Sequence, residues 1–129
     1  MTDEKIQQII TKTVATTVQQ LKAAGLLRDD TQSAYKKTEE LLRQYPKLQG
    51  VQEPYARRVV QAIDACLEEA ANEPYVDVIR LYYFEGMKNA ACANALFCGE
   101  RTCRRNRKKL VQQFSARLAS DAFLQELLG

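Results

Sequence analysis

Two kinds of chemically active side chain are crowded into the stretch LFCGERTCRRNRKKL, residues 96–110. Cysteine thiolates bind metal ions such as zinc, and closely spaced arginine and lysine side chains bind polyanions. Cys98 and Cys103 lie within this stretch, Cys92 lies just before it, and Cys66 is more distant. The stretch therefore raises two hypotheses, a small metal site and a cationic binding surface.

The spacing of the cysteines argues against zinc. A structural zinc ion takes four Cys or His ligands, usually in close pairs. Here 25, five and four residues separate successive cysteines, and the chain contains no histidine. Cys92, Cys98 and Cys103 would supply three thiols, and the fourth ligand would have to be Cys66 or a carboxylate. We therefore predict no metal site and no cofactor, and we expect the thiols to fill gaps in a hydrophobic core.

A helix beginning near Arg101 would separate the apolar and basic residues. At 100° per residue, one side of this helix is apolar, comprising Cys103, Leu110, Val111 and Phe114. Arg101, Arg105 and Lys108 lie about 140° to 200° from Cys103, on the opposite side. Arg107 lies only about 40° from Cys103, so we expect it to form a structural salt bridge or to extend along the core surface.

Positive charge is concentrated at the C-terminal end of the chain. The whole chain has a formal charge of +3, but residues 101–129 carry seven basic and two acidic residues. The basic residues are Arg101, Arg104, Arg105, Arg107, Lys108, Lys109 and Arg117. A solvated helix face would explain such a run, but clustered cations also release counterions from a polyanion. No acidic residue occurs between 101 and 120, which favours the polyanion.

The N-terminal half is predicted to form three helices. The first begins at Asp3, carries apolar residues from Ile6 to Leu21 and ends at Gly25. The second begins at a cap among residues 29–31 and ends at Pro46, which lacks a backbone donor. The third begins at Pro54 and carries a regular apolar stripe that includes Cys66. Its stripe consists of Ala56, Val59, Val60, Ile63, Cys66, Leu67 and Ala70.

The C-terminal half is also predicted to be helical. Asn72 is expected to cap a short helix that Gly86 ends. The composition of YVDVIRLYYF also suits a β-strand, but its polar residues lack a period of two, which favours the helix. A short helix at about 89–97 follows, then the turn Cys98-Gly99-Glu100, and a basic helix from Arg101 to about Ala119. Ser120 and Asp121 are expected to cap a last amphipathic helix.

These elements predict an all-α protein in two parts. Residues 1–72 would form an N-terminal helical arm or bundle, and residues 73–129 a C-terminal unit with a helical extension. No apolar run approaches the roughly 18 to 20 residues that span a bilayer, and the start MTDEKIQQ is polar and acidic, unlike a secretory signal. We therefore expect no contact with a membrane and a cytoplasmic location.

The segment VIRLYYFEGMKNAACANALFCGERTCRRNRKKL resembles the C-terminal helix-turn-helix of bacterial sigma factors, which reads the −35 promoter element. It is also similar to the related module of phage-encoded transcription regulators of the ArpU and RinA type. The match covers about residues 75–114 and includes "VIRLYYFEG", the spacing to the turn, and "ERT" followed by a core residue and "RR". In that pattern Cys92, Cys98 and Cys103 occupy positions usually held by Ile, Ile and Val.

The chain departs from that pattern in three places. Phe97 replaces the usual turn glycine, and its side chain resists the left-handed conformation. Gly99 replaces the usual Ser or Thr cap, and Ala90-Ala91 replaces an acidic pair. These departures allow a second interpretation, in which this helix-turn-helix is degenerate and no longer recognises a specific DNA sequence.

The resemblance implies a set of DNA contacts. The residues that would point into the major groove are Glu100, Arg101, Thr102, Arg104 and Arg105. Arginine can donate two hydrogen bonds to guanine, and Glu100 could accept one from the amine of cytosine. Lys88, Lys108 and Lys109 would contact phosphates.

Two functions follow as hypotheses. The first is a sequence-specific transcription regulator of phage origin that binds double-stranded DNA, with N-terminal helices that contact RNA polymerase or a second protomer. The alternative is a helical oligomerisation or DNA-packaging accessory protein that binds DNA nonspecifically. With no histidine, no Gly-rich phosphate loop and no nucleophile beside a plausible base, we expect no enzymatic activity.

Overall fold

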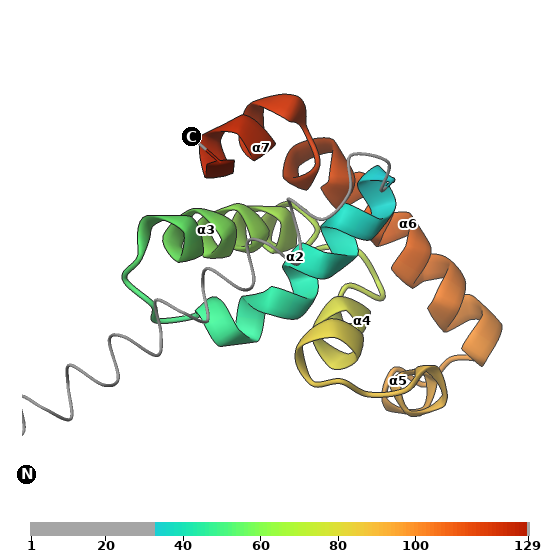
Figure 1. Ribbon diagram of the computed structural model, residues 1–129. Coiled ribbons are helices and arrows are strands. Elements are labelled where there is room, and N and C mark those ends of the chain that lie inside the picture. The colour runs from blue at the N-terminus through green and yellow to red at the C-terminus, as the bar shows by residue number, and fades with distance from the viewer. Residues whose placement is uncertain (1–32, 129) are drawn as a thin grey trace, which may run out of the picture.

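The computed structural model describes residues 33–128, in which all regular elements are helices (Figure 1). They are α2 (Ala34–Leu48), α3 (Pro54–Glu69), α4 (Asp77–Ile79), the π-helix η1 (Arg80–Phe84), α5 (Asn89–Ala95), α6 (Glu100–Leu118) and α7 (Asp121–Leu128). The predicted all-α class is confirmed. The helix predicted from Asp3 to Gly25, and the caps predicted at residues 29–31, lie outside the described residues.

Helix α2 begins as a capped helix and continues past its proline. The Ser33 side chain accepts a hydrogen bond from the Lys36 N–H at 3.2 Å, as an N-cap should. The prediction that Pro46 ends the helix is wrong, because Pro46 lies inside it. Proline here removes one hydrogen bond near the C-terminus, while Tyr45 and Leu48 are buried and hold the last turn against the core.

Helix α3 begins at Pro54, as predicted. The Glu53 side chain caps the helix by accepting from the Ala56 N–H at 3.1 Å. The buried positions of α3 are Tyr55, Ala56, Val59, Ala62, Ile63 and Cys66. This stripe packs against α2, where the Tyr55 hydroxyl donates to Gln44 at 2.7 Å. The expected core position of Cys66 is confirmed, since only 3% of its surface is exposed.

The segment between α3 and α5 is helical, as predicted, but starts later than expected. Asn72 does not cap a helix, because the chain turns through residues 70–76 before α4 begins at Asp77. The Glu73 N–H donates to the Ala70 carbonyl at 2.9 Å within these turns. Helix α4 then widens into η1, and Gly86 follows with a φ of 70°. The strand alternative for residues 75–84 is therefore excluded.

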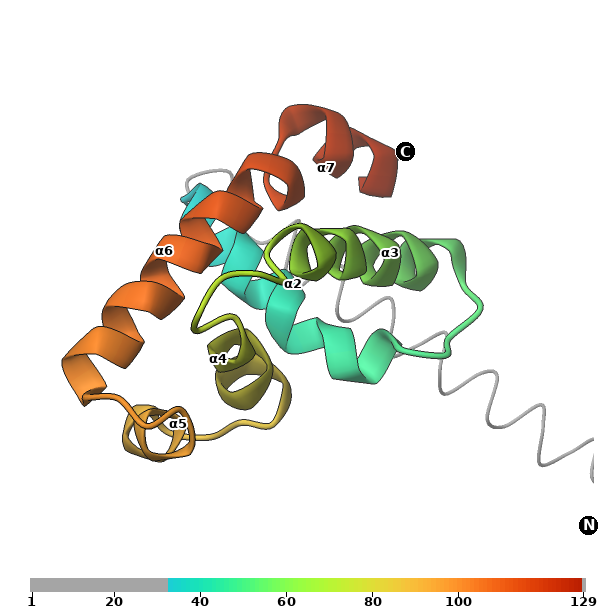
Figure 2. The ribbon, with the colours of Figure 1, turned by 180° about the vertical axis from the view of Figure 1, so that it is seen from behind.

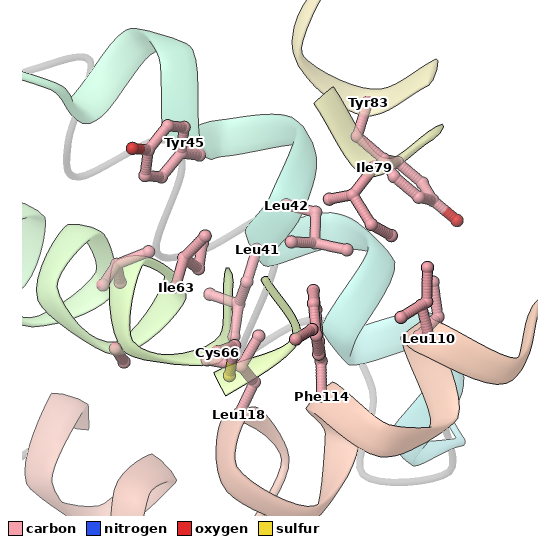
Figure 3. Close-up of a cluster of buried hydrophobic side chains, with 14 of the residues drawn as sticks. Leu41, Leu42, Tyr45, Ile63, Cys66, Ile79, Tyr83, Leu110, Phe114 and Leu118 are labelled. Carbon is pink, nitrogen blue, oxygen red and sulfur yellow. The ribbon is translucent and has the colours of Figure 1, made fainter. Parts of the chain in front are cut away.

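One hydrophobic cluster joins the described helices. Its side chains come from α2, α3, α4, η1, α5, α6 and α7. Figure 3 shows Leu41 of α2 between Ile63 of α3 and Phe114 of α6, and Leu42 of α2 toward Ile79 of α4. The predicted boundary at residues 72–73 falls in the turns after α3, and side chains from both sides of it enter this cluster. Within residues 33–128, none of the helices combines the length and the apolar composition of a membrane-spanning segment.

Candidate nucleic-acid interface

Helix α6 owes its orientation to a buried apolar side. Its fully or almost fully buried hydrophobic residues are Cys103, Leu110, Val111, Phe114 and Leu118. Together with Arg107, which is also buried, these residues follow the three- and four-residue spacing of a helix that rests on a core. The side predicted to face the core therefore does so, and the opposite side of α6 is left to solvent.

The exposed side of α6 is strongly cationic. We define the α6 basic face as five exposed cations of this helix, Arg101, Arg104, Arg105, Lys108 and Lys109. Arg117, which is also exposed, is left out because it pairs with Glu69. Together with Gln112 the five cations surround a shallow, open depression on the helix surface. No carboxylate among residues 33–128 forms an ion pair with any of the five. Their mutual repulsion is thus not relieved within this part of the chain, and an approaching polyanion would relieve it.

Arg107 differs from these five cations because it is buried and has an ion-pair partner. Its side chain is 10% exposed and its Nη1 lies 3.8 Å from Glu39 Oε2. The same Nη1 donates to the Tyr83 hydroxyl at 3.2 Å, and the guanidinium carbon lies 3.9 Å from the centre of the Tyr82 ring. Burial alone would lower the pKa of Arg107, but its contacts with Tyr83 and Tyr82 raise it. Of the two structural roles predicted for Arg107, a salt bridge or extension along the core surface, the structure shows the salt bridge.

Other predicted contact residues lie at the start of α6 or beside it. Glu100 is the first residue of α6 and is exposed, whereas Thr102 is half-buried. Lys88 is exposed and immediately precedes α5. The Asn89 side chain donates to the Glu100 carbonyl at 3.2 Å, which joins the beginnings of the two helices. The fold therefore brings the backbone next to Lys88 close to that of Glu100. Thr102 is less accessible to solvent than Arg101 or Arg104.

The turn between α5 and α6 keeps a regular helix ending despite lacking the usual glycine. Phe97 adopts a φ of 56°. The Cys98 N–H donates to the Ala93 carbonyl at 3.0 Å, and the Phe97 N–H donates to the Asn94 carbonyl at 3.3 Å. These are the two hydrogen bonds of a Schellman motif, in which the residue at the position of Phe97 is left-handed and usually glycine. Phe97 therefore adopts the conformation that its side chain was expected to resist.

The thiols near the turn belong to the core. Cys92 and Cys103 are fully buried, and Cys98 is half-buried and packs against the same hydrophobic cluster. Burial raises the pKa of Cys92 and of Cys103, and a hydrogen bond with Cys98 further raises that of Cys103. A raised pKa disfavours the thiolate that a metal ion or an oxidant needs. Among residues 33–128 no group of three or more Cys, Asp or Glu side chains is arranged to hold a metal ion.

The partners of Arg107 were missed by the sequence analysis. Glu39 and Tyr83 are 44 residues apart, yet the Tyr83 hydroxyl donates to Glu39 Oε2 at 2.6 Å. The paired tyrosines of "RLYYF" were predicted only as part of a short helix, and Glu39 only as part of the helix that begins among residues 29–31. The sequence indicated only that Arg107 lies near the apolar side of its helix. That position predicts a partner for the guanidinium but does not identify it.

Comparison of the chain with protein-family models, with curated proteins and with solved structures gives no match. The function is therefore argued from the geometry of α6 and its surroundings.

Proposed function

We propose that the chain is a sequence-specific transcription regulator that binds double-stranded DNA by inserting α6 into the major groove. The observation that carries this proposal is the α6 basic face. Its five cations are exposed, form no ion pair with a described carboxylate, and lie opposite a buried apolar side. A helix held firmly on one side and cationic on the other suits a partner with closely spaced phosphates.

The placement of α6 in the molecule supports entry into a groove. Helix α5 and the first turns of α6 lie at the end of the molecule opposite α7 in both views (Figures 1 and 2). An α-helix with its side chains is about 10 to 12 Å across, and the major groove of B-DNA is about 12 Å wide. The leading end of α6 can therefore enter the groove while α3 and α7 remain clear of the duplex.

The proposed roles of the contact residues follow their exposure and position. Glu100, Arg101, Arg104 and Arg105 occupy the first two turns of α6 and are exposed, so we assign them to base edges. Lys108 and Lys109 lie one turn further on, and Lys88 precedes α5, so we assign these three to phosphates. Thr102 is half-buried, and its proposed base contact is limited to the exposed part of its side chain.

This proposal is tested by selecting the duplexes that the full chain binds from a random pool. The full chain is then titrated against the selected duplex and against scrambled DNA. We expect the selected duplex to bind at least about a thousandfold more tightly than scrambled DNA at physiological salt. Arg105→Ala should weaken binding to the selected duplex by about 1 to 3 kcal/mol and relax base preference at one position. Arg117→Gln is the matched control, because Arg117 pairs with Glu69 away from the α6 basic face.

Equal binding to all duplexes would reject sequence-specific regulation. It would favour the alternative, a helical oligomerisation or packaging accessory protein that holds DNA through phosphates alone.

The resemblance to phage regulators adds a proposal about partners. A regulator of this kind would act in the cytoplasm and would contact RNA polymerase or a second protomer through its N-terminal helices. Light scattering of the full chain, alone and after mixing with RNA polymerase, tests both contacts. A monomer that does not associate with the polymerase would reject this part of the proposal and leave the DNA-binding part standing.

A further inference from the structure

Phe97 combines two unfavourable features. Its surface is 97% exposed, and no other large hydrophobic side chain among the described residues is exposed. It is also the only non-glycine residue among them with a positive φ, at 56°. A left-handed conformation is unfavourable for a residue with a Cβ. An aromatic ring that stays in water also lacks the stabilisation that burial would give it.

The fold gives no reason for a phenylalanine at this position. The Schellman motif uses the backbone of Phe97, and glycine or asparagine would serve it better. The exposed fraction of 97% leaves the ring almost no contact with the rest of the described chain. An observed outlier of this kind supports a hypothesis of function.

The position of Phe97 connects it to the proposed DNA interface. Three consecutive Cα–Cα steps of 3.8 Å separate it from Glu100, so the two Cα atoms lie within about 11 Å of each other. Cys98, the next residue, packs against the hydrophobic cluster. The turn is thus anchored on one side, and it presents the Phe97 ring from a fixed backbone beside the first turn of α6.

The surroundings of Phe97 favour DNA over a protein as the partner. The core of a protein–protein interface needs a cluster of apolar side chains, but the exposed residues within three positions of Phe97 in the sequence are Asn94, Ala95, Gly99 and Glu100. The α6 basic face begins at Arg101, one residue further along. DNA offers a single apolar group on a base edge in the major groove, the C5 methyl of thymine, which phenylalanine can contact.

We infer that Phe97 is a specificity-determining residue that contacts a thymine methyl group beside the bases read by α6. This inference rests on the proposed function. It adds a base contact from the turn before α6 and predicts a required thymine at one end of the recognised sequence.

The test uses the full chain and its selected duplex, with each thymine replaced in turn by deoxyuridine, which removes only the methyl group. We expect one such replacement to weaken binding of the wild-type chain by about fourfold, the effect of one buried methyl group. Phe97→Asn should weaken binding to the thymine duplex by a similar or larger factor, and it should lose the discrimination between thymine and uracil at that position.

Two variants separate this contact from an effect on folding. Asparagine tolerates the left-handed conformation, so Phe97→Asn should have a midpoint of thermal unfolding equal to or above that of the wild type. Phe97→Leu keeps the backbone strain and an apolar side chain, and it should retain most of the thymine preference. If a variant is more stable than the wild type and yet discriminates less between thymine and uracil, unfolding cannot explain the lost discrimination.

The possible outcomes distinguish the inference from the proposed function. If the wild-type chain binds all duplexes equally, the proposed function fails. If it selects a sequence without a required thymine, or if Phe97→Asn keeps the same penalty for uracil, only the inference fails. If Phe97→Asn binds DNA normally but loses a protein partner, the ring is a protein contact and the inference is overturned.

Discussion

Arg107 of α6 and Glu39 of α2 form an ion pair, with Nη1 and Oε2 3.8 Å apart, and the Tyr83 hydroxyl is hydrogen-bonded to both. Tyr83 belongs to η1, so this cluster links three helices that are distant in the sequence. It adds to the buried apolar side in holding α6 against α2. The contacts of Arg107, the one buried arginine of α6, therefore help to set the direction in which the α6 basic face points.

Replacing Arg107 by Ala should lower the free energy of unfolding by about 1.5 to 3 kcal/mol, the range for loss of a hydrogen bond to a charged group. The change removes the contacts of the buried guanidinium with Glu39, Tyr83 and the Tyr82 ring, while Glu39 keeps Arg43 and the Tyr83 hydroxyl as partners. Urea unfolding measures the loss. The matched control is Arg105→Ala, which removes an exposed cation from the same helix and should change stability by less than about 0.5 kcal/mol. Equal stability of the two variants would contradict the structural role of Arg107.

DNA binding should depend steeply on salt. If the α6 basic face and its neighbours engage about five phosphates, the plot of log affinity against log salt concentration should have a slope of about −4 to −5. Lys108→Gln should make this slope less steep by about one unit and weaken binding similarly on all sequences. Fluorescence anisotropy at several salt concentrations measures both effects. An unchanged slope would show that Lys108 does not contact a phosphate.

Replacing Phe97 by Gly should raise stability by about 0.5 to 1 kcal/mol. The left-handed conformation disfavours phenylalanine by roughly 1 to 2 kcal/mol, and the greater freedom of glycine in the unfolded chain offsets part of this gain. The Cβ of Phe97 makes no contribution to the core that would be lost, because the side chain is almost wholly exposed. Thermal unfolding measures the shift, and a marked loss of stability would contradict the strain assigned to Phe97.

Stability should fall at alkaline pH because of buried thiols. Burial raises the pKa of Cys66 from its ordinary value of 9.0 to about 11. The folded state therefore holds the proton of the Cys66 thiol more tightly than the unfolded state does. The stability that this difference contributes is fully present below about pH 9 and is lost as the pH rises to about 11. Cys66 alone should account for a loss of about 1 kcal/mol between pH 7 and pH 10.

Urea unfolding of the wild type and of Cys66→Ala at these two pH values checks this loss. The variant should be less stable at pH 7, because it creates a small cavity, but it should lose less stability between pH 7 and pH 10. An identical loss in both proteins would show that Cys66 does not carry the effect. Cys92 and Cys103 have pKa values raised in the same direction, so a residual loss is expected.

Local patterns in the sequence determined the helices and the two sides of α6. Cys103, Leu110, Val111 and Phe114 fall on one side of a helical wheel and the run of cations falls opposite them. This pattern predicts a helix with one buried and one basic side, because helix periodicity is a short-range property. The same reasoning placed Cys66, Cys92 and Cys103 in the core. The proposed DNA contacts themselves, from Lys88 to Lys109, stay predictions.

Only the tertiary structure decided how these helices are held and where local preferences give way. Pro46 is accommodated within α2 because Tyr45 and Leu48 are buried on either side of it. Phe97 takes a conformation suited to glycine because two backbone hydrogen bonds and the packing of Cys98 fix the turn. Glu39 and Tyr83 meet Arg107 only when α2, η1 and α6 pack together. Contacts between distant residues outweigh single-residue preferences of about 1 to 3 kcal/mol, and no local pattern encodes which distant residues will meet.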